Sequence, residues 1–473
     1  MAVPTVLIMA AGRGTRMRSR LPKVLHPLCG RPLVLWPVEA ARAAGAERIV
    51  VVLGPDAEQV RTVLPPDIEI AIQDPPAGTG DAVLAAREQL VDSKDVIVLS
   101  GDHPLLDSSF VTALARRHDE SGAAATVTTR ELADPGSYGR VVRAPDGDIE
   151  RIVETKHPEQ CTPEQLAIEE INAGAYAFDV GPLLEALDQV APDGSQGEIF
   201  LGDALPLMSA GGGKIVAHLT DDEAVGLGIN TRADLARAQR VAQALILERH
   251  MLAGVTIVNP AATVIDVDVT VGQDTTIEPF SYLRGHTEIG GDCTVGPVTT
   301  LIDSALGDGA SVVCSYLDSC EVLKGCRVGP FTHIRPGTAL EDGAKAGAFV
   351  EVKNSRVGEG TKIPHLAYVG DADLGPGTNI GAGTITANYD GRAKHRTVIG
   401  SGVRTGVHTS LVAPVSVGDD AYTGAGSVIT EDVPAGALGI ARPPQTNVEG
   451  YAERKDKDSK NTDETTKEKA TGE

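Results

Sequence analysis

Residues 269–296 read VTVGQDTTIEPFSYLRGHTEIGGDCTVG, and a branched aliphatic residue recurs in this stretch at every sixth position. The same spacing returns twice later in the chain, where alanine or threonine occupies some of the positions. A period of six fits neither an amphipathic helix nor a simple alternating strand. The positions concerned are Val271, Ile277, Leu283, Ile289, Val295 and Leu301, then Val328, Ile334, Leu340, Ala346 and Val352, then Ile399, Thr405, Leu411, Val417, Thr423 and Ile429.

Hexapeptide repeats of this kind indicate a parallel β-helix, in which each hexad forms a short strand and a corner, and three hexads close one triangular coil. We therefore expect one side chain per hexad to point inward, with roughly 18 residues per coil and about nine coils. Aromatic residues make up only 3% of the chain, as expected if small aliphatic side chains fill a narrow prism. An oligomerising spacer is the simplest alternative for such a stretch.

The length of 473 residues predicts two or three domains. No apolar run approaches the length of a membrane span, and the opening MAVPTVLIMAAGRG breaks into glycines too early for a signal peptide. We therefore expect a cytoplasmic protein without membrane insertion.

A net charge of -23 argues against nucleic acid as a partner. Cys314, Cys320 and Cys326 also lie six apart, which would place them on different faces of a coil as free thiols.

Upstream of the repeats, expected strands at 3–9, 48–53, 68–73 and 95–102 alternate with helical stretches. This alternation predicts an α/β domain with a Rossmann-like, mostly parallel sheet, whose ligands bind beyond the carboxyl ends of the strands. Asp102 ends a buried apolar strand, where an unpaired carboxylate is costly and a metal ion would offset the cost. The alternative role for Asp102, a cap for the helix from Ser108, is disfavoured because Ser108 lies six positions further along the chain.

The first strand is followed by Ala11-Gly12-x-Gly14-Thr15-Arg16-Met17 and then by Pro22-Lys23. Gly12-x-Gly14 alone is weak evidence, and it fails the dinucleotide-binding pattern because Met17 stands where the third glycine belongs. The longer string resembles the sugar-phosphate nucleotidyltransferases. Outside that resemblance, Lys23 would be read as a solvated surface lysine.

Four later motifs resemble one branch of that family, the uridyltransferases acting on N-acetylglucosamine 1-phosphate. They are Tyr138-Gly139-Arg140, Ile152-Val153-Glu154, Glu170-Ile171-Asn172-Ala173-Gly174 and Gly228-Ile229-Asn230, each of which alone could be turn or cap chemistry.

The resemblance implies a role for each matching residue of the uridyltransferase half. Catalytic charge neutralisation is implied for Lys23 and Arg16. It implies that Gly139, Glu154 and Asn172 bind the sugar and that Gln73, Gly78 and Thr79 bind the uracil. It also implies that Asp102 and Asn230 bind Mg²⁺. Further nucleotide contacts are implied for Met9, Ala10, Ala11, Gly12, Ser100 and Gly101.

The repeats are interrupted at 386–398, TANYDGRAKHRTV, and polar residues gather in the sequence around this interruption. Arg335 and Lys353 are 18 residues apart, or one coil, so we expect them to stack as an anion clamp for a sugar phosphate. A lone histidine such as His365 is more often a structural residue whose ring nitrogens are hydrogen-bonded within the fold. The clamp before it and the asparagines after it favour a functional role.

The strings His365-Leu366-x-Tyr368-x-Gly370-Asp371 and Asn379 to Gly391 resemble the acetyltransferase half of the same bifunctional family. The resemblance implies that His365 is the catalytic base, that Arg335 and Lys353 hold the sugar phosphate, and that Tyr368 and Asn379 orient the ring. Contacts to acetyl-CoA are implied for Ala382, Asn388, Tyr389, Val407, Ala425 and Arg442. Val407 is a departure, because the family often has a serine at that place.

The sequence is therefore identified as a member of the bifunctional N-acetylglucosamine-1-phosphate uridyltransferases and glucosamine-1-phosphate N-acetyltransferases. The family implies glucosamine 1-phosphate, N-acetylglucosamine 1-phosphate, UTP and acetyl-CoA as substrates, a homotrimer, a left-handed β-helix and a product used for bacterial cell-wall polymers. Two rivals are a nucleotidyltransferase of single activity with a β-helix for assembly, and a non-catalytic regulatory subunit.

The expected domains are a uridyltransferase domain at 1–230, a linker helix at 231–254, an acetyltransferase β-helix at 255–450 and a disordered tail at 451–473. The linker helix is expected because its stretch has no internal proline or glycine and its apolar residues follow helical spacing. The tail lacks aliphatic residues larger than alanine from residue 453 onward.

Overall fold

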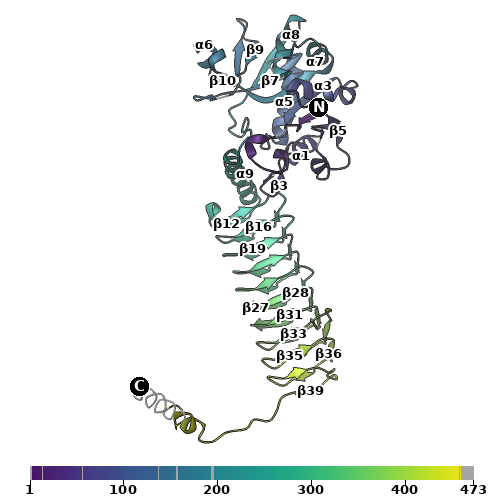
Figure 1. The fold of residues 1–473 in the computed structure, drawn as a ribbon, viewed down its shortest axis with the longest axis vertical. Coiled ribbons are helices and arrows are strands. Elements are labelled where there is room, and N and C mark those ends of the chain that lie inside the picture. The colour runs from purple at the N-terminus through teal and green to yellow at the C-terminus, as the bar shows by residue number, and fades with distance from the viewer. Residues whose placement is uncertain are drawn as a thin grey trace, which may run out of the picture. The chain divides into compact units, whose positions relative to one another are not determined.

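The computed structural model describes residues 3–457 and 459, apart from 13, 56, 137, 156, 157 and 193–196. It divides into two compact units, Met1–Asp303 and Ser304–Glu473. Unit 1 contains an α/β sheet, a long helix and the first coils of short strands, and unit 2 contains further coils (Figure 1).

The sheet of unit 1 is mixed, in the order β11-β7-β10-β6-β1-β4-β5. Along this order the strands pair in parallel except β10, which runs antiparallel to β6 and β7, and the attached β8 and β9 also pair in antiparallel fashion. The expected strands upstream of the repeats are confirmed as β1, β4, β5 and β6. The bounds are β1 Thr5–Met9, β4 Ile49–Leu53, β5 Glu69–Ile72, β6 Asp95–Ser100, β7 Ala125–Glu131, β10 Glu170–Asp179 and β11 Ile215–Leu219, with the hairpin β8 Arg140–Arg143 and β9 Ile149–Val153 beside β10.

Helices cover both faces of this sheet, because successive strand residues point to opposite sides. Leu7 belongs to a core with Val83 and Leu183, whereas Val6 belongs to a second core with Val38 and Leu114. The helices are α1 Leu35–Ala43, α2 Glu58–Arg61, α3 Thr79–Ala85, α4 Arg87–Leu90, α5 Ser108–Ser121, α6 Pro163–Leu166, α7 Val180–Leu187 and α8 Ala204–Ala210.

The helix α5 is capped by Asp107, whose carboxylate accepts a hydrogen bond of 2.8 Å from the backbone nitrogen of Phe110. Asp102 therefore has no capping role there. The expected long helix is α9, Arg232–Leu252, and it begins with a capping box between Thr231 and Asp234. The Gln243 side chain of α9 bonds to both backbone polar groups of Ile265 in the first coil.

The coils are built from short parallel strands in both units. In unit 1 they are β12 Thr256–Ile257, β13 Val264–Ile265, β14 Thr270–Val271, β15 Thr276–Ile277, β16 Tyr282–Arg284, β17 Glu288–Ile289, β18 Thr294–Val295 and β19 Thr300–Ile302. The remaining short strands of unit 1 form the pair β2 Pro27–Leu28 and β3 Arg31–Pro32.

Unit 2 contains three ladders of parallel strands. Ladder A is β21 Ser311–Val312, β24 Arg327–Val328, β27 Lys345–Ala348 and β30 Lys362–His365. Ladder B is β22 Tyr316–Asp318, β25 His333–Ile334, β28 Glu351–Lys353, β31 Tyr368–Gly370, β33 Ile385–Ala387, β35 Ser410–Val412 and β38 Val428–Ile429. Ladder C is β20 Ala305–Leu306, β23 Glu321–Val322, β26 Ala339–Leu340, β29 Arg356–Val357, β32 Ala372–Leu374, β34 Thr397–Ile399 and β36 Val415–Val417, and a separate pair is β37 Tyr422–Thr423 with β39 Leu438–Gly439.

The prediction that one side chain of each hexad points inward is confirmed. Every side chain at the stride of six is buried except Val271, which is half-buried. The interruption is also present, because the chain between β33 and β34 forms a loop in which Tyr389 and Lys394 make an antiparallel bridge. A parallel β-helix with one projecting loop accounts for these features.

We expect Leu340→Ala to lower the free energy of unfolding by about 2–5 kcal/mol, because it leaves a cavity in the narrow prism. Leu340 is fully buried, whereas Leu323 in the neighbouring coil is 41% exposed. The control Leu323→Ala should therefore cost well under about 1 kcal/mol. Urea denaturation followed by circular dichroism measures both values, and equal losses would contradict an inward-facing Leu340.

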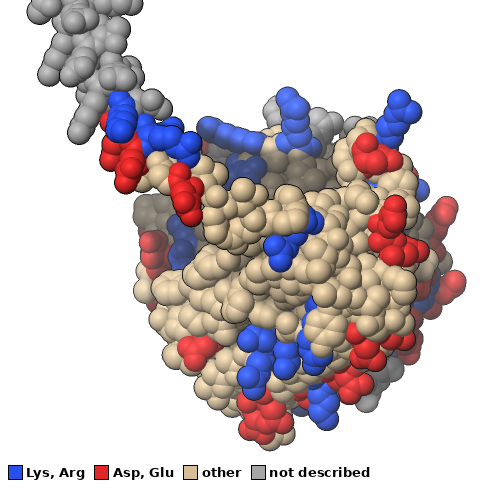
Figure 2. Space-filling view, turned by 90° about the horizontal axis from the view of Figure 1, so that it is seen from below, with Lys and Arg blue, Asp and Glu red and all other residues tan. Residues whose placement is uncertain are grey.

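None of the helices in the described part of the chain is both long and apolar enough to cross a membrane. Lys and Arg side chains lie singly or in small groups among Asp and Glu on the face shown in Figure 2. The backbone of residues 451–457 is helical, and most of the tail, 458 and 460–473, lies outside the described residues. The disordered tail therefore stays a prediction.

Candidate active sites

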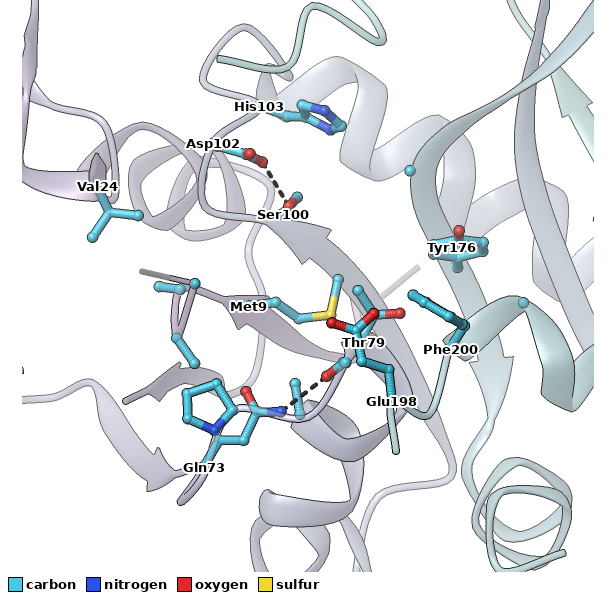
Figure 3. Close-up of a pocket in the computed structure, with 18 of the residues that line it drawn as sticks. Met9, Val24, Gln73, Thr79, Ser100, Asp102, His103, Tyr176, Glu198 and Phe200 are labelled. Carbon is cyan, nitrogen blue, oxygen red and sulfur yellow. Dashed lines mark hydrogen bonds between the residues drawn. The ribbon is translucent and has the colours of Figure 1, made fainter. Parts of the chain in front are cut away.

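A cavity of about 500 Å³ lies at the carboxyl ends of β1, β5 and β6 in unit 1. In the view of Figure 3, Gln73 and Asp102 lie on opposite sides of this cavity, with Met9 and Thr79 between them. Of the residues expected to bind nucleotide or sugar, those lining it are Met9, Ala10, Ala11, Gly12, Lys23, Gln73, Gly78, Thr79, Ser100, Asp102, Glu154 and Asn172.

Four expected residues do not line the cavity, namely Gly101, Gly139, Arg16 and Asn230. A Cβ atom at Gly139 would lie 3.5 Å from Glu154 Oε1, and the amide of Gly101 donates to Met9 O over 2.9 Å. Arg16 and Asn230 are hydrogen-bonded to each other over 2.8 Å.

Lys23 connects the expected metal ligands. Its Nζ atom donates to Asp102 Oδ2 over 2.5 Å and to Asn230 Oδ1 over 3.4 Å. The two oxygens therefore converge on one cationic position. Carboxylate and amide oxygens suit Mg²⁺, which also keeps waters and takes phosphate oxygens, so this donor set fits the ion.

Asp102 is held as a carboxylate. Burial acts to raise its pKa, but nearby His103 and Lys23 and hydrogen bonds from Lys23 and Ser100 outweigh burial and lower the pKa to about 2. Burial also lowers the pKa of His103, so its imidazole is neutral near pH 7. At that pH, Lys23 and the 2.7 Å bond from Ser100 Oγ therefore stabilise the charge.

Gln73 has a fixed orientation at the other side of the cavity. Its Nε2 atom donates to Gly78 O over 2.9 Å and to Asp81 Oδ2 over 2.7 Å. Because both amide hydrogens are used, the side chain can offer a ligand only its carbonyl oxygen.

Asn172 lies at an irregularity of β10, where the register with β7 shifts before Tyr176. Its Nδ2 atom donates to Tyr176 Oη over 2.6 Å, and its Oδ1 atom accepts from Gly174 N over 3.1 Å. The cavity is also lined by Tyr176, Glu198 and Phe200, which were not predicted from the sequence (Figure 3). Tyr176 lies two residues beyond the matched motif that ends at Gly174, but nothing in the sequence marks Glu198 or Phe200.

His103 also lines this cavity, and two glycines enclose it. A Cβ atom would lie 2.8 Å from its Cε1 atom at Gly174 and 2.5 Å from its Nε2 atom at Gly228. These glycines leave the space that the imidazole fills beside Asp102.

In unit 2, Arg335 and Lys353 are neighbours in ladder B. The register pairs Ile334 with Val352, and Arg335 N donates to Val352 O over 2.9 Å. Lys353 Nζ donates to Asp371 Oδ2 over 3.3 Å, whereas Arg335 is paired with Glu351 over 2.8 Å. The two cations thus follow one another at the same edge of successive strands.

Asp371, which ends a matched motif but had no predicted role, is the centre of a polar network. Its carboxylate accepts from Asn354 over 2.6 Å and also from Asn388, which lies 3.5 Å from Tyr368 Oη. Burial acts to raise the pKa of Asp371, but hydrogen bonds from Asn354, Asn388 and Lys353 outweigh it, so the pKa falls below its usual value.

Lys394, in the projecting loop, adds a third cation to the expected pair. The adjacent Lys353 is the main cause of the lowered pKa of Lys394, and Arg335 contributes to it. We call Arg335, Lys353 and Lys394 the cationic cluster. Sequence spacing cannot reveal how a loop folds back, so Lys394 was not predicted.

His365 is the exposed last residue of β30 in ladder A, and its backbone pairs with Ala348. Asn379 continues this ladder through bridges to Lys362 and Arg404. Tyr368 begins the next strand, in ladder B, so one corner separates the histidine from the cationic cluster. No hydrogen bond joins His365 to that cluster among the described residues.

The expected acetyl-CoA residues Ala382, Val407 and Ala425 follow one another in successive coils. His408 N donates to Ala382 O over 2.7 Å, and Gly426 N donates to Val407 O over 2.8 Å. Arg442 lies next to this column, because a Cβ atom at Gly426 would be 3.9 Å from its Cδ atom. Tyr389 is exposed in the projecting loop, and Asn388 is buried beneath it.

The α/β fold of unit 1, with its cavity at the carboxyl ends of the strands, is that of a nucleotidyltransferase, and the coils form a second, hexapeptide-repeat part. Consistent with this class, the MobA-like NTP transferase domain family matches residues 6–173.

Comparison with known proteins identifies the family. The Bifunctional protein GlmU of Mycobacterium tuberculosis (strain ATCC 25177 / H37Ra) is 48% identical over 459 residues, which cover 95% of this chain and 92% of that protein. The Bifunctional protein GlmU of Mycolicibacterium gilvum (strain PYR-GCK) is 47% identical, with 97% and 94% covered. The chain belongs to the GlmU family of bifunctional enzymes. A solved UDP-glucose pyrophosphorylase complexed with UDP-glucose matches with a TM-score of 0.42 at 20% identity, over 51% of this chain and 99% of that one.

Proposed function

We propose that the chain makes UDP-N-acetylglucosamine in two steps at two sites. Glucosamine 1-phosphate is first acetylated on nitrogen by acetyl-CoA, and uridylyl transfer from UTP to N-acetylglucosamine 1-phosphate then releases pyrophosphate. The observation that carries the proposal is a similarity of 48% identity that extends over 95% of the chain and so includes both sets of site residues.

In the uridyltransferase reaction, a phosphate oxygen of the sugar attacks the α-phosphorus of UTP, and the bond to pyrophosphate breaks. A phosphate is already a competent nucleophile, so this site needs no dedicated base. Lys23 and Arg16 neutralise charge on the phosphates, and Asp102 and Asn230 hold Mg²⁺, which supplies further charge neutralisation when bound. Gln73 presents its carbonyl oxygen to the N–H group of uracil. Gly139, Glu154 and Asn172 hold the sugar.

Gly14 fixes Lys23 in this arrangement. Gly14 has φ +60°, and a Cβ atom there would collide with Lys23 Cβ. We therefore expect Gly14→Ala to lower kcat/KM for uridylyl transfer by about 10²-fold, because small displacements of a positioning group are costly. A coupled pyrophosphate assay measures this. Gly45→Ala is the control, since Gly45 also has positive φ but open space around its Cα atom. Equal effects of the two changes would remove the role assigned to Gly14.

In the acetyltransferase reaction, the amine of the sugar attacks the thioester carbon, the carbon–sulfur bond breaks, and CoA leaves as thiolate. His365 accepts the proton from the amine, because an imidazole nitrogen is the commonest general base in enzymes. The cationic cluster holds the sugar phosphate, and Tyr368 and Asn379 orient the ring. Ala382, Asn388, Tyr389, Val407, Ala425 and Arg442 contact acetyl-CoA. The absent hydroxyl at Val407 removes one hydrogen bond, worth about 1 kcal/mol.

The acetyltransferase works as a homotrimer. Exposed apolar side chains from successive corners, Phe331, Phe349 and Leu366, form a ridge that a second copy can cover. The rings of Phe331 and Phe349 stack with centroids 5.2 Å apart. His365 is adjacent to Leu366, so a neighbouring subunit on this ridge would complete the acetyl site. The proposed compartment is the cytoplasm, because the proposed substrates are metabolites of that compartment and the cysteines are free thiols.

A two-signal assay tests the proposed function. The protein is mixed with glucosamine 1-phosphate, acetyl-CoA, UTP and Mg²⁺, and free thiol and pyrophosphate are followed separately. Both products should appear, with pyrophosphate after thiol. Pyrophosphate formation from N-acetylglucosamine 1-phosphate without thiol release from glucosamine 1-phosphate would favour the single-activity rival. Absence of both products would favour the regulatory subunit.

A further inference from the structure

A second group of titratable residues in unit 1 lies at the opposite ends of the strands from the cavity described above. Asp95 begins β6 and Asp179 ends β10, and the register pairs these two residues directly. His118 comes from α5. One ligand atom from each of the three lies within 4.8 Å of the others. Asp95 and His118 line a separate cavity of about 550 Å³.

Two atoms of this group are buried without a hydrogen-bond partner among the described residues: His118 Nε2 and Asp95 Oδ1. His118 is only 4% exposed. Its Nε2 atom lies 3.3 Å from Asp179 Oδ1, but the pair lacks hydrogen-bond geometry. A buried polar atom without a protein partner costs free energy, so these two atoms favour the binding of a ligand between them.

A hydrogen bond at Nδ1 fixes the orientation of the His118 imidazole. His118 Nδ1 lies 3.0 Å from Thr126 Oγ1, and Thr126 is fully buried in β7. Metal-binding histidines are commonly held in this way by a hydrogen bond at the second ring nitrogen. The bond leaves Nε2 directed at the two carboxylates.

The carboxylates also lack sufficient neutralising charge. Lys94 Nζ donates to Asp95 Oδ2 over 3.3 Å, and no other side chain in the described part of the chain donates a hydrogen bond to Asp95. Burial raises the pKa of Asp179, and neighbouring Asp95 raises it further, although His118 opposes both effects. A cation between the three residues would offset this repulsion and satisfy both unpartnered atoms.

We propose that Asp95, His118 and Asp179 form a binding site for a divalent transition-metal ion, for which Zn²⁺ is the probe. One imidazole nitrogen and carboxylate oxygens are ordinary zinc ligands, whereas Mg²⁺ prefers oxygen ligands alone. The bound ion would tie α5 to β6 and β10. The site is distinct from the position between Asp102 and Asn230, and it does not depend on the proposed reactions.

Calorimetric titration of the full-length protein with zinc chloride tests the proposal. An Asp102→Asn background keeps the catalytic cation position from contributing. We expect one zinc ion per chain, with affinity lowered at least tenfold by Asp179→Asn or Asp95→Asn. Asp119→Asn is the matched control, because Asp119 lines the same cavity outside the group of three. Its affinity should equal that of the background protein.

Two further measurements cover variants that fold poorly. The thermal midpoint of the background protein should rise with excess Zn²⁺, and Asp179→Asn should abolish that rise. Co²⁺ in place of Zn²⁺ should give a visible absorption spectrum typical of nitrogen and oxygen ligation, which His118→Gln should alter. No saturable zinc binding, or the same affinity in Asp179→Asn and Asp119→Asn, would overturn the proposal and leave two carboxyl groups that share a proton.

Discussion

Replacing Asp102 with alanine is expected to lower uridylyl transfer by about 10³-fold or more, while acetyl transfer keeps its normal rate. Asp102 supplies the only carboxylate of the proposed Mg²⁺ pair, and it also binds the Lys23 ammonium over 2.5 Å. The change removes a metal ligand and a partner of the catalytic lysine at once. Losses of several kcal/mol in transition-state stabilisation are typical when a metal position is lost.

Magnesium-dependent release of pyrophosphate from UTP and N-acetylglucosamine 1-phosphate measures the effect of Asp102→Ala. Asp107→Ala is the control, because it removes a helix cap five residues away and should cost about 1 kcal/mol of stability without loss of turnover. Undiminished pyrophosphate release by Asp102→Ala would remove this residue from the metal site.

Replacing His365 with alanine is expected to lower acetyl transfer by roughly 10²–10⁴-fold and to leave uridylyl transfer near normal. The imidazole is exposed at the end of β30, so truncation should leave the coil intact. A thiol reagent that reports free CoA measures acetyl transfer, and the pyrophosphate assay is run on the same preparation.

His286→Ala provides the comparison for His365, since His286 is another exposed histidine of a hexapeptide coil. It should leave both activities unchanged. Equal loss of both activities in His365→Ala would argue against two independent sites. Loss of acetyl transfer without a changed dependence on pH would argue that His365 positions the substrate and is not the base.

The sequence predicts the coils well because the period of six is a local property. Each hexad places its own aliphatic residue inward, and Leu340 can be assigned without knowledge of any other segment. The ends of β1, β5 and β6 follow in the same way, because ligands gather where parallel strands end. Most cavity residues could therefore be selected from short motifs.

The remaining site features depend on how distant segments meet. Lys394 reaches Lys353 only because the projecting loop folds back, and Glu198 and Phe200 reach the cavity from an irregular segment. The group of Asp95 and Asp179 with His118 comes from two strands and a helix that are far apart in sequence. No spacing rule connects residues whose proximity is set by tertiary packing.

The position of Lys23 has a consequence for how the nucleotide and the metal ion affect each other's binding. Its ammonium group stands between the oxygens of Asp102 and Asn230, and a metal ion cannot share that place. If these oxygens hold the ion as proposed, a nucleotide phosphate that attracts Lys23 away lowers the free-energy cost of loading the metal. Thermodynamic reciprocity then requires the metal to tighten nucleotide binding by the same factor. On this proposal, Lys23 would make the binding of nucleotide and metal ion cooperative.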